Sequence, residues 1–316
     1  MPLLGAHLSA AGGPSRAVAA AIRLGCRSLQ IFLRPPGRWA AGPLSEEEAD
    51  RFASLVAQAG LGGAAFAHAP YLLNLASADE SLRTRSITAL VEELQRAGRL
   101  GLAGVVLHPG SAGTGDREAA ARRCRTALGE AIRRAGAGAA RVLLEGTAGG
   151  GGHLGSTPAG LAALVPEGHS VGVCLDTAHL WGAGYDLTGA GWKRVASELE
   201  EHFGRPAPDL VHANDTNVPF GSRRDRHAPP GEGLLGEAFY RRLLGEPALA
   251  GTPVVVEIPP GEDNRLIAVA LERLRGWSGG GRRPRRREDA DSPRRGGGGT
   301  ESSRRESRRR RTRSPV

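Results

Sequence analysis

The stretch VGVCLD, residues 171–176, is an apolar run without polar alternation that ends in a carboxylate. A strand with one face in water alternates polar and apolar residues, whereas a strand of a parallel sheet covered on both faces is apolar throughout. Seven further runs repeat this design, at 3–7, 28–32, 64–68, 104–108, 141–145, 210–215 and 253–257. We therefore predict eight strands of a buried parallel sheet.

Segments with helical periodicity follow these runs, for example at 15–24, 45–60 and 81–100. The second opens with Ser45 and Glu48 in the S-x-x-E spacing of a capping box. Eight strand–helix units in one chain are typical of a (β/α)8 TIM barrel, with a doubly wound sheet as the main alternative. No G-x-G-x-x-G follows the first run, which argues against a dinucleotide-binding doubly wound sheet. We predict a single α/β TIM barrel over residues 1–276.

The net charge of +9 comes entirely from the C-terminal segment. Residues 277–316 hold 14 arginines and 5 acidic residues, which leaves 28 basic and 28 acidic residues in 1–276. The segment is rich in Gly, Arg, Ser and Pro, so we expect it to be disordered. It is either a solvated tail without a specific role or an electrostatic tether to nucleic acid. Any anion site in the barrel itself must be local.

Composition also bears on the compartment. No apolar run approaches the roughly 18 to 20 residues of a membrane span, and the N-terminus lacks the basic region of a signal peptide. The cysteines Cys26, Cys124 and Cys174 are odd in number and far apart, so they do not form a disulfide framework. We expect a cytoplasmic protein without a membrane partner.

The ends of the predicted strands share one chemistry. Seven of the eight end in, or just before, a residue that can bind a metal: His7, His68, His108, Glu145, Asp176 with His179, His212 with Asp215, and Glu257. Active sites of TIM barrels lie at the C-terminal ends of the strands, so these side chains would converge. Carboxylates this close together repel unless cations compensate. Mixed imidazole and carboxylate ligands favour Zn²⁺ or Mn²⁺, and we predict a polynuclear metal centre.

Eight motifs then carry a family resemblance: GAHLSAAGG (5–13), HAPYLLNL (68–75), LHPGS (107–111), LEGTAGGG (144–151), GVCLDTAHLWGAGYD (172–186), VHANDT (211–216), GSRRDRHAPPGEG (221–233) and VVVEIPP (254–260). Through them, residues 3–275 resemble the endonuclease IV family of apurinic/apyrimidinic (AP) endonucleases, which are zinc-dependent DNA-repair enzymes on a TIM barrel. The patterns DTxHxxxAGYD and DRHxxxGEG are the most specific.

The resemblance implies three zinc ions, for which Mn²⁺ is a possible substitute. His68, His108 and Glu145 would hold the first ion. Glu145 would bridge to the second, which also takes Asp176, His212 and Glu257. His179, Asp225 and His227 would hold the third. Glu145 as the bridge and Glu257 as the residue that orients the nucleophile are the implied catalytic residues.

The implied reaction is hydrolysis of the phosphodiester on the 5′ side of an abasic site in double-stranded DNA, leaving a 3′-hydroxyl. Cleaning of blocked 3′ ends is expected as well, and the family suggests a monomer. Tyr71 and Leu72 match positions that fill the gap in the base stack, and Arg38 matches a DNA-contacting position within one residue. Arg223, Arg224 and Arg226 are further candidates for DNA contacts, since they flank the ligands of the third ion.

The sequence departs from the family pattern at two places, and two other functions are alternatives to the one that the resemblance implies. Gly146 follows the bridging glutamate where the family often has Asn, and RPPGRW (34–39) replaces a KNxRxW-like pattern. A sugar isomerase or epimerase on the same barrel also uses strand-end metals, although the only lysine, Lys193, falls in a predicted outer helix. A non-catalytic nucleic-acid-binding protein driven by the arginine tail would leave the nine ligand positions unexplained.

Overall fold

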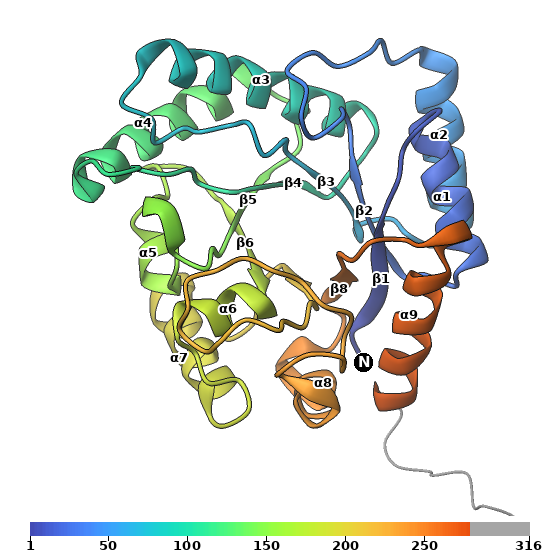
Figure 1. The fold of residues 1–316 in the computed structure, drawn as a ribbon. Helices are drawn as coiled ribbons and strands as arrows, with labels where there is room; N and C mark the ends of the chain where they lie inside the picture. The colour runs from blue at the N-terminus through green and yellow to red at the C-terminus, as the bar shows by residue number, and fades with distance from the viewer. Residues whose placement is uncertain (279–316) are drawn as a thin grey trace, which may run out of the picture. The chain divides into compact units, whose positions relative to one another are not determined.

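The structure, a computed structural model, describes residues 1–278. Eight parallel strands close into a barrel in chain order (Figure 1). They are β1 (Leu3–Leu8), β2 (Ser28–Phe32), β3 (Ala65–His68), β4 (Gly104–Leu107), β5 (Val142–Glu145), β6 (Gly172–Asp176), β7 (Leu210–His212) and β8 (Pro253–Val256). Each lies within one of the predicted runs, except that β1 continues to Leu8. The predicted TIM barrel is confirmed.

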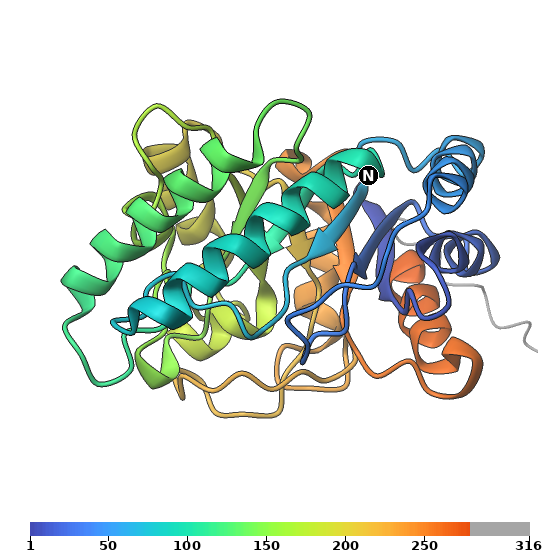
Figure 2. The ribbon, with the colours of Figure 1, turned by 90° about the horizontal axis from the view of Figure 1, so that it is seen from above.

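Helices cover the outside of this barrel. They are α1 (Pro14–Arg23), α2 (Glu46–Gln58), α3 (Glu80–Arg99), α4 (Arg117–Ala135), α5 (Pro158–Ala162), α6 (Thr177–Ala183), α7 (Gly191–Phe203), α8 (Gly236–Gly245) and α9 (Arg265–Ser278). Figure 2 shows α3 and α4 lying side by side along one flank. Short 3-10 turns occupy Gly150–Gly152, Pro247–Leu249 and Glu262–Asn264. No helix among residues 1–278 is both long and apolar enough to cross a membrane.

The core has two parts, as expected for this architecture. Most buried apolar residues lie between the strands and the helices. A separate cluster forms from single residues of six strands, namely Phe66, Val106, Leu143, Cys174, Leu210 and Val255. These side chains point into the barrel and fill it, so the barrel is a packed core. Polar side chains that point inward beyond this layer must therefore gather at the mouth.

The cap of α2 differs in part from the predicted capping box. The Ser45 hydroxyl accepts from the Glu48 amide at 3.2 Å, as the spacing predicts. The Glu48 carboxylate turns instead to the first turn of α1, where it accepts from the amide and the hydroxyl of Ser15 at 2.8 and 3.0 Å. The second half of the box is wrong because an orphan amide of a neighbouring helix competes for the same carboxylate.

The C-terminal helix extends beyond the expected boundary. Trp277 and Ser278, the first two residues of the expected tail, belong to α9, and the Trp277 ring stacks on Tyr240 with centroids 5.9 Å apart. The rest of the expected basic tail, residues 279–316, lies outside the described residues.

Candidate metal centre

Strand geometry brings the predicted ligands together. Side chains alternate between the two faces of a strand, so a residue two positions after an inward residue also points inward. The six residues that fill the barrel are each followed two positions later by a predicted ligand: His68, His108, Glu145, Asp176, His212 and Glu257. The ligands thus form a polar layer directly above an apolar one.

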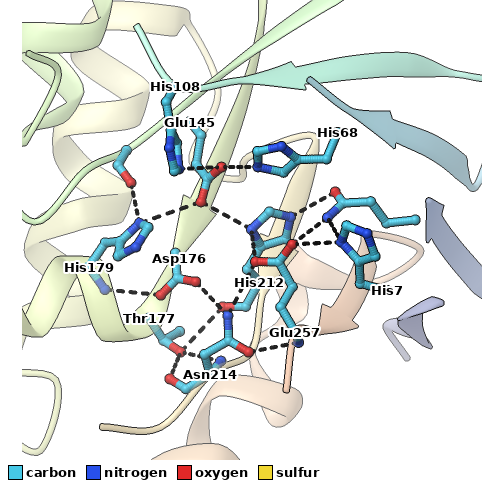
Figure 3. A network of polar contacts seen from close by, with 12 residues as sticks. His7, His68, His108, Glu145, Asp176, Thr177, His179, His212, Asn214 and Glu257 are labelled. Atoms are coloured by element: carbon cyan, nitrogen blue, oxygen red, sulfur yellow. Dashed lines mark hydrogen bonds and ion pairs between the residues drawn. The ribbon is translucent and has the colours of Figure 1, made fainter. Parts of the chain in front are cut away.

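Three overlapping groups of side chains in this layer have ligand atoms within 4.8 Å of one another. They are His68, His108 and Glu145; then Glu145, Asp176, His212 and Glu257; then Asp176, His179 and His227. Asp225 faces the third group, with its carboxylate oxygens 3.2 Å from the Nε2 atoms of both His179 and His227. All nine predicted ligand positions therefore meet at the barrel mouth, and Figure 3 shows the inner part of this network.

Backbone carbonyls fix the outer nitrogen of three of the histidines. The Nδ1 atoms of His68, His179 and His227 lie 2.6, 2.8 and 3.1 Å from the carbonyl oxygens of Ala69, Gly146 and Glu257. A carbonyl only accepts, so each Nδ1 carries the proton and each Nε2 faces the carboxylates. Metal-binding histidines have this arrangement, in which the outer hydrogen bond sets the tautomer.

The inner nitrogens have the geometry expected of metal ligands. The Nε2 atoms of His108, His179 and His227 are buried and have no hydrogen-bond partner among the described residues. Carboxylate oxygens nevertheless lie only 2.9 to 3.2 Å from these nitrogens. A lone pair beside an anion is repulsive unless a cation interacts with both.

The Gln30 side chain determines which ring nitrogen of His212 carries the proton. The Gln30 side chain is fully buried, and its amide reaches Glu257 Oε1 and His212 Nε2. A carboxylate only accepts, so the NH2 group faces Glu257 and the carbonyl oxygen faces His212 at 2.9 Å. His212 Nε2 must therefore carry the proton. Its Nδ1 is left to face Glu145 Oε1 at 3.1 Å and Glu257 Oε2 at 2.9 Å.

The negative charges of the carboxylates in this centre need compensating positive charge. Burial alone would raise the pKa of Glu145, yet His108 and His212 hold it well below the usual range. Burial would likewise raise the pKa of Glu257, which His212 and His7 hold well below the usual range. No Arg or Lys of residues 1–278 forms an ion pair with any of the four carboxylates, Glu145, Asp176, Asp225 and Glu257.

Metal ions supply this charge better than protonated histidines would. Neighbouring imidazole rings lie with centroids 5.3 to 6.2 Å apart, so five imidazolium cations would repel one another. Neutral imidazoles and carboxylates without a thiolate suit Zn²⁺ and Mn²⁺. The donor set therefore fits a cluster of divalent cations.

Further polar residues hold the ligands without belonging to the three groups. Asn214 is fully buried; its amide donates to Asp176 Oδ2 at 2.6 Å, and its oxygen accepts from the Glu257 amide at 2.8 Å. His7, a strand-end residue, lies beside the groups with Nδ1 3.1 Å from Glu257 Oε1. The sequence interpretation missed Gln30 and Asn214. A polar residue inside an apolar run was the available signal for Gln30.

Asp215 does not reach the centre. Its carboxylate is buried and accepts from the backbone amides of Thr216, Gly231, Leu235 and Gly236 at 2.8 to 3.1 Å. It thereby fastens the loop between β7 and α8, which carries Asp225 and His227. The strand boundary explains the difference, because β7 ends at His212 and the backbone leaves the barrel wall before Asp215.

The candidate DNA-contacting residues lie around the mouth. Tyr71 is 58% exposed, and its ring stacks on His108 with centroids 5.9 Å apart, while Leu72 beside it is half-buried. Arg223, Arg224 and Arg226 are exposed, as is Arg38 in the RPPGRW segment.

The structure shows what the residues at the two departures from the family pattern contact. Arg34, at the start of RPPGRW, is buried and pairs with Glu93 of α3, so it anchors this segment while Arg38 faces outward. Gly146 has no side chain, but its carbonyl still holds His179.

Comparison with known proteins finds a family profile and named relatives. A family profile described as "Xylose isomerase-like TIM barrel" matches residues 18–277. A protein named "Probable endonuclease 4" from Nitratidesulfovibrio vulgaris strain DP4 is 41% identical over 284 residues, which is 87% of this chain and 100% of that protein. A protein of the same name from Oleidesulfovibrio alaskensis is 45% identical over 282 residues, which is 86% and 95% of the two chains.

The chain belongs to the endonuclease IV family. The crystal structure of endonuclease IV from Thermus thermophilus superimposes with a TM-score of 0.78 at 36% identity, covering 87% of this chain and 98% of that one. The sequence resemblance is thereby confirmed, and the protein is an enzyme of the deoxyribonuclease IV type. A D-tagatose 3-epimerase-like protein also matches, with a TM-score of 0.65 at 20% identity over 86% and 96% of the chains, which shows the shared fold alone.

Proposed function

We propose that this endonuclease IV-family enzyme hydrolyses the phosphodiester 5′ to abasic sites in double-stranded DNA and leaves a 3′-hydroxyl. The nine residues of the mouth would hold three zinc ions, and Mn²⁺ would serve in their place. The observation that carries the proposal is the set of three overlapping ligand groups. Three of their inner imidazole nitrogens, those of His108, His179 and His227, are buried and lack hydrogen-bond partners among the described residues. The same centre would clean blocked 3′ ends, because these are also phosphate esters of a DNA terminus.

Bound zinc ions would lower the pKa of a water to supply the nucleophile and would neutralise charge on the phosphate oxygens. The two glutamates have different parts in this reaction. Glu145 is fully buried and belongs to both the first and the second ligand group, so it would hold the two ions at a fixed separation. The Glu257 side chain is 11% exposed and lines the cavity at the mouth, so it can meet a substrate.

Fixed orientation is what allows Glu257 to act on an attacking water. Oε1 is held by His7 and Gln30, and Oε2 faces His212 at 2.9 Å. The Glu257 backbone amide is held by Asn214 as well. A carboxylate positioned on every side in this way loses little freedom when it directs a water towards the phosphate.

The surroundings of the centre suit a DNA strand. Residues 1–276 carry no net charge, so attraction to phosphates must come from arginines near the mouth. Arg223, Arg224 and Arg226 meet this need on one side, and Tyr71 with Leu72 offers an apolar edge for the gap left by the missing base. These contacts can be made by one chain, and we propose a monomer.

The alternatives explain fewer of these observations. An isomerase or epimerase on the same barrel does not account for the third group, to which the β7–α8 loop adds Asp225 and His227. Lys193, the only lysine, is exposed on α7 outside the barrel, so it does not serve a sugar substrate at the mouth. A protein that only binds nucleic acid has no need of a buried polycarboxylate cluster.

An incision assay tests the proposal. A 5′-labelled duplex with one abasic site should be cut on its 5′ side, and a DNA polymerase should extend the product. The variant H179A should lose the activity, whereas the matched control H202A, exposed on α7, should retain it. Interconversion of aldoses and ketoses without any incision would refute the assignment.

A further inference from the structure

Exposed aromatic side chains are rare in this protein. The chain has only 6 Phe, 3 Tyr and 4 Trp. Among residues 1–278, Tyr71 and Phe220 alone of these are exposed, at 58% and 49%. Tyr71 follows β3 and Phe220 follows β7, and these strands are four places apart in a closed barrel of eight. The two rings therefore belong to opposite sides of the mouth.

Phe220 is held firmly by the helix that carries a metal-ligand candidate. Its ring lies edge-on against Trp181 of α6, with centroids 5.0 Å apart. The amides of Gly221 and Arg223 donate to the carbonyls of Trp181 and Gly182 at 3.1 and 2.9 Å, and Trp181 Nε1 donates to Val218 at 3.0 Å. Figure 1 shows this part of the β7–α8 loop passing across α6. The Phe220 ring is thus fixed relative to His179, which lies in the first turn of the same helix.

The charge next to Phe220 suits a nucleic acid. Arg223 and Arg224 are exposed, and neither forms an ion pair within the described part of the chain. An exposed ring beside unpaired guanidinium groups is the combination that binds unpaired nucleotides, with the base on the ring and the phosphate on the arginine. A protein partner would require a wider apolar patch than one ring.

We propose that Phe220 stacks on the nucleobase that faces the abasic nucleotide, on the side of the site opposite Tyr71. The proposal rests on the proposed function, because an abasic duplex contains one base that lacks a pairing partner. Such a base is the least costly to draw out of the helix. Stacking of one base on an aromatic ring contributes about 5- to 140-fold in affinity.

The test uses a duplex with 2-aminopurine opposite an abasic analogue and a phosphorothioate at the scissile bond. The fluorescence of 2-aminopurine reports its stacking directly. F220A should weaken binding by about 5- to 140-fold and abolish the fluorescence change, whereas F220W should keep both. F220L should behave like F220A, because leucine preserves an apolar contact with Trp181 but cannot stack. L234A, at a 50% exposed apolar residue of the same loop, is the matched control and should bind like the wild type.

The results of this test either support or overturn the stacking role of Phe220. Equal affinity and equal fluorescence change in F220A and the wild type would overturn the proposal. If F220A also loses bound metal, F220L with its full metal content decides in its place. Failure of the wild type to prefer the abasic duplex over an intact one would instead refute the proposed function, so the two failures are distinguishable.

Discussion

Replacing Gln30 by methionine removes one buried amide from beneath the candidate metal centre. Methionine has a similar length and no branch, so the change affects hydrogen bonds more than packing. The side chain loses its acceptor for His212 Nε2 and its donor for Glu257. His212 then has no partner that keeps the proton on Nε2 and the lone pair of Nδ1 towards the two glutamates.

The size of the effect follows from these contacts. Removing the outer partner of a metal ligand typically lowers metal affinity 10- to 100-fold, or by about 1.4 to 2.8 kcal/mol. His212 is completely buried, so its unpaired N–H also costs about 1 to 3 kcal/mol of stability in the metal-free protein. We expect both losses in Q30M.

Competition with a zinc-binding indicator measures the affinity, and urea unfolding of the metal-free protein measures the stability. The matched control is Q58M, because the exposed Gln58 amide donates only to Ser54 at 3.0 Å. Q30M with the zinc affinity and stability of Q58M would show that the amide does not hold the ligands, and the tautomer assignment of His212 would be wrong.

Further predictions concern the third ion, the β2–α2 segment, the tail and metal removal. H227A should lose one of three metals and most of the incision rate; normal activity with two metals left would overturn the role of His227. R34M should lower the free energy of unfolding by about 3 to 5 kcal/mol because Glu93 is left buried and unpaired. The exposed pair of Arg99 and Glu46 provides the control, and R99M should cost about 0 to 1 kcal/mol in the same urea titration. Deleting 279–316 should weaken DNA binding at low salt and flatten its salt dependence without abolishing incision, and an unchanged slope would make the tail inert. Chelation of the metals should lower the midpoint of thermal unfolding, since ions that bind only the folded chain stabilise it; equal midpoints with and without chelator would count against a bound cluster.

The fold was predictable because its signal is repeated. Every strand lies at an apolar run, and one such run would have been ambiguous between strand and buried helix. The candidate ligands were predictable for a related reason. Each strand-end ligand follows an inward apolar residue at a spacing of two, so one rule places them all at the same mouth.

The features that the sequence did not predict depend on contacts between elements that are distant in the chain. Gln30 and Asn214 hold ligands from other strands, and nothing in their local sequence indicates those partners. Glu48 has the spacing of a local cap but serves α1, and Asp215 looks like a ligand but fastens a loop. In each case a polar group found its partner through tertiary packing, which local spacing does not encode.

The central claim is that nine side chains at the barrel mouth form one centre for three zinc ions. Anomalous X-ray diffraction at the zinc absorption edge, on crystals grown without chelator, tests it most directly. The account predicts three zinc peaks, one in each ligand group, with Glu145 between the first two. One or two peaks, or a peak outside the three groups, would contradict it.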